Sequence, residues 1–353
     1  MSDHNGTLLR VRDLRTCFNT EDGVVKAVDG VSFRIDAGRT FALVGESGCG
    51  KSVTAFSILK LLPYPPAHHP SGTIEMEGQM LLHVTARGGQ AVDDGLSEAQ
   101  MRHVRGEKIS MIFQEPMSSL NPVFTCGSQI VEAIRLHRRM SGWQAAQLAI
   151  ELLDKVGIPE PAQRFREYPH QMSGGMRQRV MIAMALSCNP RLLIADEPTT
   201  ALDVTIQAQI LDLLKDIQAQ TGLSIMLITH DLAVVAGVAD VVAVMYASKI
   251  AELASASELF TKPLHPYTHG LFRSLPRLGE KKHRLDTIGG NVPNPLQFPS
   301  GCKFNPRCPL AMDRCRTDEP ALREVQPGHW CACWAVEGYE RAPTTDPSAV
   351  RAG

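Results

Sequence analysis

The segment that most constrains the fold of this chain is Gly-Glu-Ser-Gly-Cys-Gly-Lys-Ser at residues 45–52. It follows an apolar run at residues 41–44, which predicts a buried strand, and it precedes a helical pattern over residues 52–62. Such a turn presents backbone N–H groups to phosphate, and its lysine reaches the β- and γ-phosphate oxygens. We therefore predict an ATP site with Mg²⁺. Its residues are Gly45, Glu46, Ser47, Gly48, Cys49, Gly50, Lys51, Ser52 and Val53.

Further apolar runs predict the rest of an α/β core. Runs at residues 192–195, 225–228 and 241–245 are separated by helical patterns, as buried parallel strands would be. Before residue 40, segments 8–18 and 24–35 alternate apolar and polar residues, which is typical of antiparallel strands. The predicted fold is therefore α/β, with a mostly parallel sheet and an N-terminal antiparallel β subdomain.

Changes in residue composition and pattern divide the chain into regions. Residues 120–172 read as mostly helical, residues 82–95 as a polar, glycine-rich surface loop, and prolines interrupt short segments from about residue 257 onward. We predict a nucleotide-binding domain at 1–256 with an inserted helical subdomain at about 118–188, a loop-rich C-terminal metal-cluster domain at 257–340, and a disordered tail at 341–353.

Composition excludes several classes of protein. The chain has 353 residues and a formal net charge of −1, so no global basic field favours nucleic acid. No apolar run approaches the roughly 20 residues of a membrane-spanning helix. The N-terminus has no basic region followed by an apolar stretch, so we expect no secretory signal. We expect a cytosolic protein whose membrane role comes through a partner.

Two acidic residues stand where a buried strand is expected to end. Asp196 and Glu197 directly follow the run at residues 192–195. Because the carboxyl ends of parallel strands meet at one edge of a sheet, we expect Asp196 and Ser52 to hold Mg²⁺. Strand side chains alternate, so Glu197 should point elsewhere and serve as base or orienter for the attacking water.

Two further polar side chains follow expected strands. His230 comes after the run at residues 225–229, and Gln114 comes after residues 109–113. An imidazole can contact a γ-phosphate or hold a water, and an amide can contact both Mg²⁺ and water. We take both as candidate catalytic residues, and Gln114 also as a Mg²⁺ ligand.

A second anion-binding turn stands far downstream. Ser173, Gly174 and Gly175 open a helical pattern over residues 176–187. The start of a helix offers free N–H groups and a positive dipole end to phosphate. The chain therefore carries two phosphate-binding turns.

Five of the nine cysteines fall between Cys302 and Cys333. In a cytosolic protein such crowding favours a metal over disulfides. The tight Cys pairs of zinc sites are missing, and wider spacing suits a [4Fe–4S] cluster with four thiolates.

The motifs described above, taken in their order along the chain, resemble those of the nucleotide-binding subunits of ABC transporters over about residues 8–255. It comprises the phosphate loop, Gln114, Ser173-Gly-Gly-Met-Arg-Gln, Leu-Ile-Ala-Asp196-Glu197, Ala201-Leu-Asp203 and His230. The resemblance implies a head-to-tail dimer in which each ATP lies between one subunit's phosphate loop and the other's Ser-Gly-Gly turn. It also implies Glu197 as general base, His230 as γ-phosphate switch, Asp203 as a dimer contact, Gln114 as the coupling residue and Phe18 as the aromatic stacked on adenine.

Three further stretches resemble the dipeptide/oligopeptide importer branch, which includes nickel and glutathione importers. They are residues 114–122, 262–268 and 301–309. This resemblance implies Cys302, Cys308, Cys315 and Cys333 as cluster ligands, with Cys331 as the alternative fourth. It also implies a peripheral ATPase at the cytoplasmic face of the bacterial inner membrane. Its partners would be a second, related ATPase subunit, two transmembrane permease subunits and an extracytoplasmic solute-binding protein.

Two other functions agree less well with the sequence. A soluble ABC ATPase acting on nucleic acid or ribosomes usually has tandem cassettes or long coiled coils, whereas this chain has one cassette and no sustained heptads. A metal- or redox-sensing module that merely binds nucleotide is disfavoured by the intact Lys51, Asp196, Glu197 and His230. A peptide-type importer remains the leading prediction, with a homodimer of ATPase subunits left open.

Overall fold

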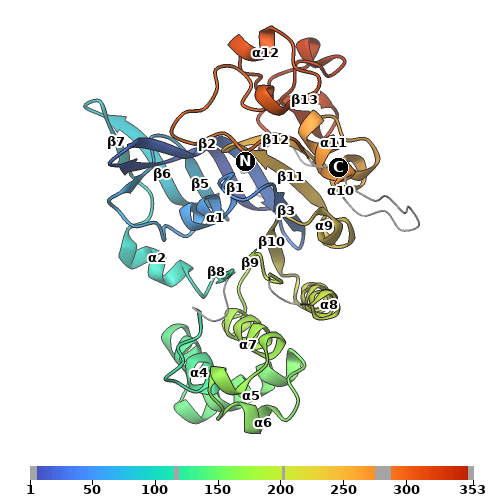
Figure 1. Ribbon diagram of the computed structural model, residues 1–353. Helices are drawn as coiled ribbons and strands as arrows, with labels where there is room; N and C mark the ends of the chain where they lie inside the picture. The colour runs from blue at the N-terminus through green and yellow to red at the C-terminus, as the bar shows by residue number, and fades with distance from the viewer. Residues whose placement is uncertain (1–5, 115–118, 201–202, 275–287, 349–353) are drawn as a thin grey trace. The chain divides into compact units, whose positions relative to one another are not determined.

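The structure is a computed structural model that describes residues 6–114, 119–200, 203–274 and 288–348. It divides into two compact units (Figure 1). The first unit contains Met1–Asp36, Thr40–Leu96 and Thr229–Gly353, and the second contains Ala37–Arg39 and Ser97–Ile228. Most of residues 114–122 are described, but residues 115–118 of that stretch and residues 201–202 lie outside the described residues.

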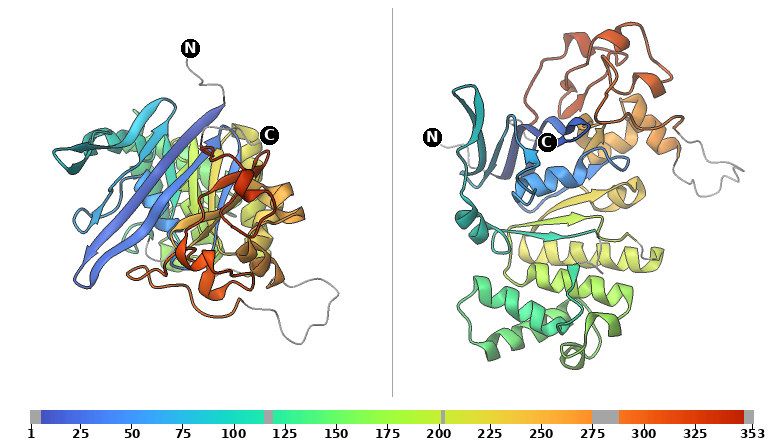
Figure 2. Two further views of the ribbon diagram at one scale, coloured as in Figure 1. Left: turned by 90° about the horizontal axis from the view of Figure 1, so that it is seen from above. Right: turned by 60° about the vertical axis from the view of Figure 1, so that its left-hand side comes forward.

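An antiparallel sheet forms the N-terminal part of the first unit. Its strands are β1 (Thr7–Thr20), β2 (Gly23–Asp36), β4 (Ala67–His68), β5 (Thr73–Met76), β6 (Gln79–Arg87) and β7 (Gln90–Asp93). The order is β2-β1-β5-β6-β7, with β4 also paired to β1. Figure 2 shows β1 and β2 as two long blue strands side by side. The antiparallel strands predicted for segments 8–18 and 24–35 are confirmed.

The prediction of a surface loop at residues 82–95 is wrong. These residues form most of the β6–β7 hairpin, with Thr85 opposite Val92. Gly88 and Gly89 close the hairpin at φ 58° and 80°. Two consecutive left-handed residues match the twist of the flanking strands, so the Gly-Gly pair marks a hairpin turn and not an irregular loop.

A second sheet of the first unit carries the phosphate loop. Its strands are β3 (Thr40–Val44), β11 (Val241–Tyr246), β12 (Lys249–Ser255), β13 (Arg323–Gln326) and β14 (His329–Cys331). The helices of this unit are α1 (Lys51–Ile58), α9 (Leu232–Val238), α10 (Ala256–Thr261), α11 (Pro266–Arg273), η2 (Asn305–Arg307), α12 (Arg314–Thr317) and η3 (Tyr339–Arg341). All five residues of β3 are buried, as a strand covered on both faces requires.

The prediction of a mostly parallel sheet is only partly right. β11 runs parallel to β3, but β12, β14 and β13 are added with antiparallel pairing. A tight turn at Ala247 and Ser248, both with positive φ, reverses the chain between β11 and β12. Antiparallel neighbours need only such a short turn, whereas a parallel neighbour needs a long crossover.

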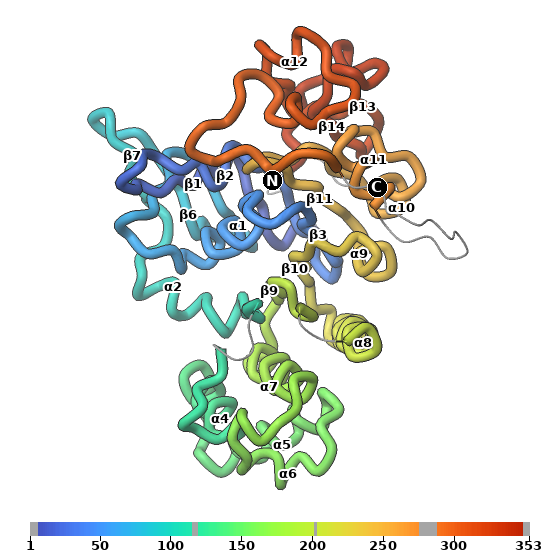
Figure 3. Tube along the Cα trace, in the orientation of Figure 1, coloured from blue at the N-terminus to red at the C-terminus, as the bar shows by residue number. Residues whose placement is uncertain are grey.

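The second unit combines parallel strands with a group of helices (Figure 3). Its elements are α2 (Glu98–Val104), β8 (Ile109–Ile112), α4 (Cys126–His137), α5 (Gly142–Lys155), α6 (Pro161–Arg164), η1 (Pro169–Gln171), α7 (Gly174–Leu186), β9 (Leu192–Asp196), α8 (Val204–Thr221) and β10 (Ser224–Thr229). Strand β9 lies between β8 and β10, parallel to both. The mostly helical reading of residues 120–172 is confirmed by α4, α5 and α6. Among the described helices, none has the length and apolar character needed to span a membrane.

The described residues near the C-terminus are held against β1. The side chain of Arg10 donates to the Ser348 carbonyl at 3.0 Å, and Arg12 donates to the Ser348 hydroxyl at 3.1 Å. Ser348 is buried. Within the tail predicted at 341–353, Ser348 is therefore held on a strand, and residues 349–353 lie outside the described residues.

A buried carboxylate organises the start of α11. Glu252 on β12 is fully buried and accepts hydrogen bonds from the backbone N–H groups of Leu264 and His265 and from the His329 ring, at 2.6, 2.9 and 2.7 Å. Burial alone would raise the pKa of Glu252, but these donors hold it below its usual value. The contribution of Glu252 to stability is therefore present above the unfolded pKa near 4.5 and is lost as pH falls through the lower folded pKa.

We predict that Glu252→Gln lowers the free energy of unfolding by about 2–4 kcal/mol, because an amide offers one acceptor oxygen and turns its own N–H groups toward buried donors. Urea unfolding at pH 7 measures the change. Glu340→Gln is the control, since Glu340 is exposed and should contribute about 0.5 kcal/mol or less. Equal losses in the two variants would contradict the role of Glu252.

Candidate nucleotide-binding site

The phosphate loop follows a path that side chains would block. A Cβ at Gly45 would lie 2.2 Å from the carbonyl oxygen of Met245, and a Cβ at Gly50 would lie 2.2 Å from that of Ala27. Both glycines have positive φ, 154° and 103°. The loop is thus fitted between β2 and β11, where only glycine brings its backbone close enough.

Lys51 lies at the start of α1 with its side chain inside the loop. Its Nζ donates to the carbonyl oxygens of Gly45 and Glu46 at 2.7 and 3.0 Å. Cys49 is buried, and burial raises the pKa of its thiol although Lys51 opposes that shift. A buried ammonium group inside the loop is positioned to bind an anion there.

The acidic residues of the second unit lie at the end of β9. Asp196 is the last residue of the strand and is 2% exposed. Glu197 lies beyond the strand with φ 47°, and its carboxylate accepts from the Gln114 amide at 2.8 Å and the Thr200 hydroxyl at 2.9 Å. The expectation that strand alternation orients Glu197 is therefore wrong, because a left-handed turn sets its direction.

The structure brings Gln114 and Glu197 together, and it adds Thr200, which sequence reasoning missed. Residues after the two acids had no periodicity, so only the fold reveals the hydroxyl contact. An amide and a hydroxyl that donate to one carboxylate oxygen fix the position of that carboxylate.

The Ser-Gly-Gly turn forms the N-terminus of α7. The Ser173 hydroxyl accepts from the Met176 N–H at 3.3 Å, which makes it the N-cap. A Cβ at Gly175 would lie 3.0 Å from Ile206 in the first turn of α8, whose N-cap Asp203 accepts from the Ile206 N–H at 2.9 Å. The structure thus brings the turn against the first turn of α8, the helix that Asp203 caps.

The remaining predicted residues lie on the first unit. Phe18 on β1 is half-buried and pairs with Val25 and Ala67 on the neighbouring strands. His230 directly follows β10 and is exposed, as are Ser47 and Gly48 of the loop. Ser52 and Val53 belong to the first turn of α1 and are half-buried.

Two residues from the C-terminal part of the first unit contact the phosphate loop. Arg307 makes a bidentate ion pair with Glu46, at 2.7 and 3.0 Å. The Glu46 N–H donates to the Tyr267 hydroxyl at 3.0 Å. Sequence reasoning found neither contact, although both residues fall in stretches that it singled out.

Four cysteines line one small cavity of about 10 Å³. They are Cys302, Cys308, Cys315 and Cys333. Burial raises the pKa of Cys302 to about 11 and that of Cys333 to about 12. Cys331 lies on β14 instead, opposite Glu252 of β12. Among the described side chains, no group of three or more His, Cys, Asp or Glu forms a site for a single metal ion.

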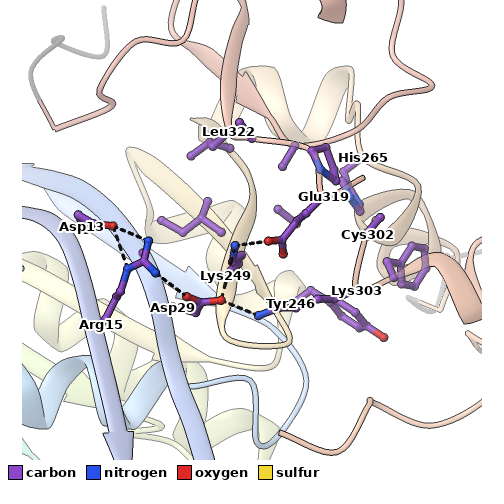
Figure 4. Close-up of a pocket in the computed structure, with 17 residues that line it drawn as sticks. Asp13, Arg15, Asp29, Tyr246, Lys249, His265, Cys302, Lys303, Glu319 and Leu322 are labelled. Carbon is purple, nitrogen blue, oxygen red and sulfur yellow. Dashed lines mark hydrogen bonds and ion pairs between the residues drawn. The ribbon is translucent and has the colours of Figure 1, made fainter. Parts of the chain in front are cut away.

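A second cavity, of about 210 Å³, shares Cys302, His265 and Phe304 with the first. Figure 4 shows its ionic side chains arranged around Asp29, which lies within 3.5 Å of Arg15 and Lys249 and within 3.1 Å of Lys303. Because cations and carboxylates here neutralise one another, this cavity has little net charge to attract a phosphate.

An α/β fold with a phosphate loop, a buried aspartate at a strand end and a second glycine turn defines a P-loop nucleotide-binding protein. Solved structures agree with this class. A dimeric ATP-binding cassette in a post-hydrolysis state bound to ADP and Pi matches with a TM-score of 0.59 at 24% identity, over 70% of this chain and 99% of that chain. The protein cbiO1 from Clostridium perfringens, part of an ABC transporter complex, matches with a TM-score of 0.59 at 25% identity, over 73% and 92%.

Sequence comparisons identify the family. The ABC transporter family model matches residues 28–200, and the model of the oligopeptide/dipeptide transporter C-terminal region matches residues 251–315. A probable peptide ABC transporter ATP-binding protein of Sinorhizobium fredii is 52% identical over 93% of this chain and 94% of its own length. The oligopeptide transport ATP-binding protein AppD of Bacillus subtilis is 50% identical over 94% and 97%. The chain belongs to the family of ABC transporter ATP-binding proteins.

We predict that Gly50→Ala destabilises the protein more than Gly48→Ala does. Both positions have positive φ, so each alanine carries strain of about 1 kcal/mol. Only Gly50 would also drive its Cβ into a backbone carbonyl, which adds about 1–3 kcal/mol, because no heavy atom lies within 4 Å of a Cβ at Gly48. Urea unfolding of the two variants measures the difference. Equal losses would mean that strain alone, and not the contact with Ala27, fixes the loop.

Proposed function

We propose that this protein is the ATP-hydrolysing subunit of a bacterial importer for dipeptides or oligopeptides. The observation that carries the proposal is the close similarity, over nearly the whole chain, to relatives named as peptide, oligopeptide or dipeptide transport ATP-binding proteins. The match of residues 251–315 to the oligopeptide/dipeptide C-terminal region supports the same branch. The proposed domain limits stay at 1–256, with a helical subdomain at about 118–188, and 257–340.

In this proposal ATP lies across two subunits. The loop at residues 45–52 and Phe18 hold the nucleotide of one subunit, while Ser173, Gly175 and Asp203 of the other complete the site. The contact of Gly175 with Ile206, whose N–H is bonded by Asp203, supports this assignment, because the turn and the start of α8 could then face one partner. ATP binding closes the dimer, and hydrolysis opens it.

Hydrolysis would proceed by attack of water on the γ-phosphorus, with Glu197 as the general base that takes a proton from the water and with ADP as the leaving group. Ser52, Asp196 and Gln114 would hold Mg²⁺, which would supply positive charge to the phosphate, and His230 would contact the γ-phosphate. What supports Glu197 is its carboxylate position, fixed by donors from Gln114 and Thr200. A base must be held within reach of the proton that it removes.

The proposed partners are a second ATPase subunit, two permease subunits and a solute-binding protein, at the cytoplasmic face of the membrane. Co-purification of the chain with permease subunits, followed by uptake of labelled peptide in vesicles, tests the substrate class. Uptake of nickel or glutathione in place of peptide would overturn the peptide assignment but leave the ATPase role intact.

We predict that Glu197→Gln abolishes turnover while MgATP still binds. Loss of a general base lowers the hydrolysis rate by about 100-fold or more, and an amide keeps the shape of the site. Phosphate release by the assembled transporter measures the rate, and calorimetric titration measures ATP affinity.

Glu151→Gln is the matched control for that variant, because Glu151 is an exposed glutamate on α5. It should hydrolyse ATP at the wild-type rate. Normal turnover in Glu197→Gln would remove Glu197 from the role of base.

The four cysteines that line one cavity support a [4Fe–4S] cluster held by Cys302, Cys308, Cys315 and Cys333. Four thiols that line a common cavity equal the number of thiolates that ligate such a cluster. The bound cluster would cross-link the loop before α12 to the segment after β14. Because these thiol pKa values are raised, binding must displace protons.

We predict that anaerobically purified protein contains about four iron and four sulfide per chain. Cys308→Ser should lose most of this iron, whereas Cys331→Ser, and Cys188→Ser in the second unit, should keep it. Metal analysis and acid-labile sulfide determination measure the content. Stoichiometric zinc without sulfide would refute the cluster, and iron loss in Cys331→Ser alone would reassign the fourth ligand.

A further inference from the structure

Two stretches that the sequence set apart, residues 262–268 and 301–309, meet at one residue of the phosphate loop. We propose that Arg307 and Tyr267 are positioning residues for this loop: they hold Glu46 from its side chain and from its backbone, and so set the conformation and the charge that the triphosphate meets. The inference rests on the proposed ATPase function, because it concerns the binding of ATP.

Arg307 is buried and holds the Glu46 carboxylate with both terminal nitrogens. Its side chain is 4% exposed, and its two terminal nitrogens each bond one oxygen of Glu46. The other donors are used to fix the guanidinium, with Nε on the Gly289 carbonyl at 3.0 Å and further bonds to the Ile288 carbonyl and the Tyr246 hydroxyl. A guanidinium whose donors are all directed in this way cannot swing aside, so Glu46 is held in one orientation.

Tyr267 holds the backbone of the same residue. It is fully buried in the first turn of α11, and its hydroxyl accepts the Glu46 N–H. Its ring packs against Tyr246 and Phe304, with centroids 4.7 and 5.5 Å away. Because Phe304 also lines the cysteine cavity, the ring cluster joins that cavity to the loop through direct contacts.

The charge of the pair matters for the ligand. Glu46 brings a carboxylate into a loop that must receive a triphosphate, and an unpaired carboxylate would repel it. Arg307 neutralises that charge, and the ion pair also raises the pKa of the guanidinium, so Arg307 stays protonated. Loss of Arg307 leaves the Glu46 carboxylate without its ion-pair partner, whereas loss of both charges removes that carboxylate as well.

The experiment measures MgATP affinity of the full-length chain by calorimetric titration, together with the melting temperature without nucleotide. Arg307→Gln should weaken binding about tenfold, and Tyr267→Phe about threefold. The double variant Glu46Gln/Arg307Gln should bind better than Arg307→Gln alone, since the repulsive charge is gone. Added salt should reduce the defect of Arg307→Gln, because it screens that repulsion.

Matched controls exist in the same region. Arg314→Gln removes an arginine that pairs with Glu340, and Tyr339→Phe removes a buried hydroxyl that donates to the Ala321 carbonyl. Both should leave MgATP affinity unchanged. The inference is overturned if the controls weaken binding as much as the test variants, if Arg307→Gln binds normally, or if the double variant binds no better than Arg307→Gln.

One further variant separates this inference from the proposed function. Lys51→Ala should abolish MgATP binding if residues 45–52 hold the nucleotide. Wild-type protein that does not bind MgATP, or Lys51→Ala that binds normally, would count against the ATPase function itself. Normal behaviour of both, with test variants that do not follow the predicted order, would overturn only the roles of Arg307 and Tyr267.

Discussion

Two backbone carbonyls, those of Ala27 and Met245, fix the path of the phosphate loop. Each lies where a side chain on Gly45 or Gly50 would have to be, so the loop depends on β2 and β11 keeping their positions. The turn after β11 strengthens this arrangement, because Ser248 donates its N–H to the Cys49 carbonyl and its hydroxyl to the Lys26 carbonyl. The antiparallel sheet, the β3–β11 pair and the loop are therefore one mechanical piece.

The C-terminal region is attached to this piece through buried polar contacts. Glu252 holds the chain that leads into α11, and α11 carries Tyr267 to the loop. A buried carboxylate with several donors has one favourable arrangement, since every displaced donor would lose its partner without gaining water. The geometry of the phosphate loop thus depends on Glu252, a residue of β12 that lies far from the loop in the sequence.

Much of the fold could be predicted because its signals are local. Helix α8, for example, begins after its cap Asp203 and ends at Gly222, and both are residue types that mark helix ends in a sequence. The β6–β7 hairpin and the antiparallel edge strands were not predicted, because a Gly-Gly pair and mixed polar segments have more than one structural reading. Most candidate site residues were found because they belong to sequence motifs or directly follow an expected strand. The ion pair of Glu46 with Arg307 joins positions 261 residues apart, and such a distance leaves no pattern in the sequence.

The division of the chain has a consequence for its synthesis. The second unit is nearly continuous, from Ser97 to Ile228, whereas the first unit joins Arg10 on β1 to Ser348. A ribosome releases residues in order, so the helices around α7 can pack while the first unit still lacks β11 to β14. Until those strands emerge, β3 has no β11 to pair with, and Gly45 has no Met245 beside it. The phosphate loop therefore reaches its final conformation only after β11 has emerged.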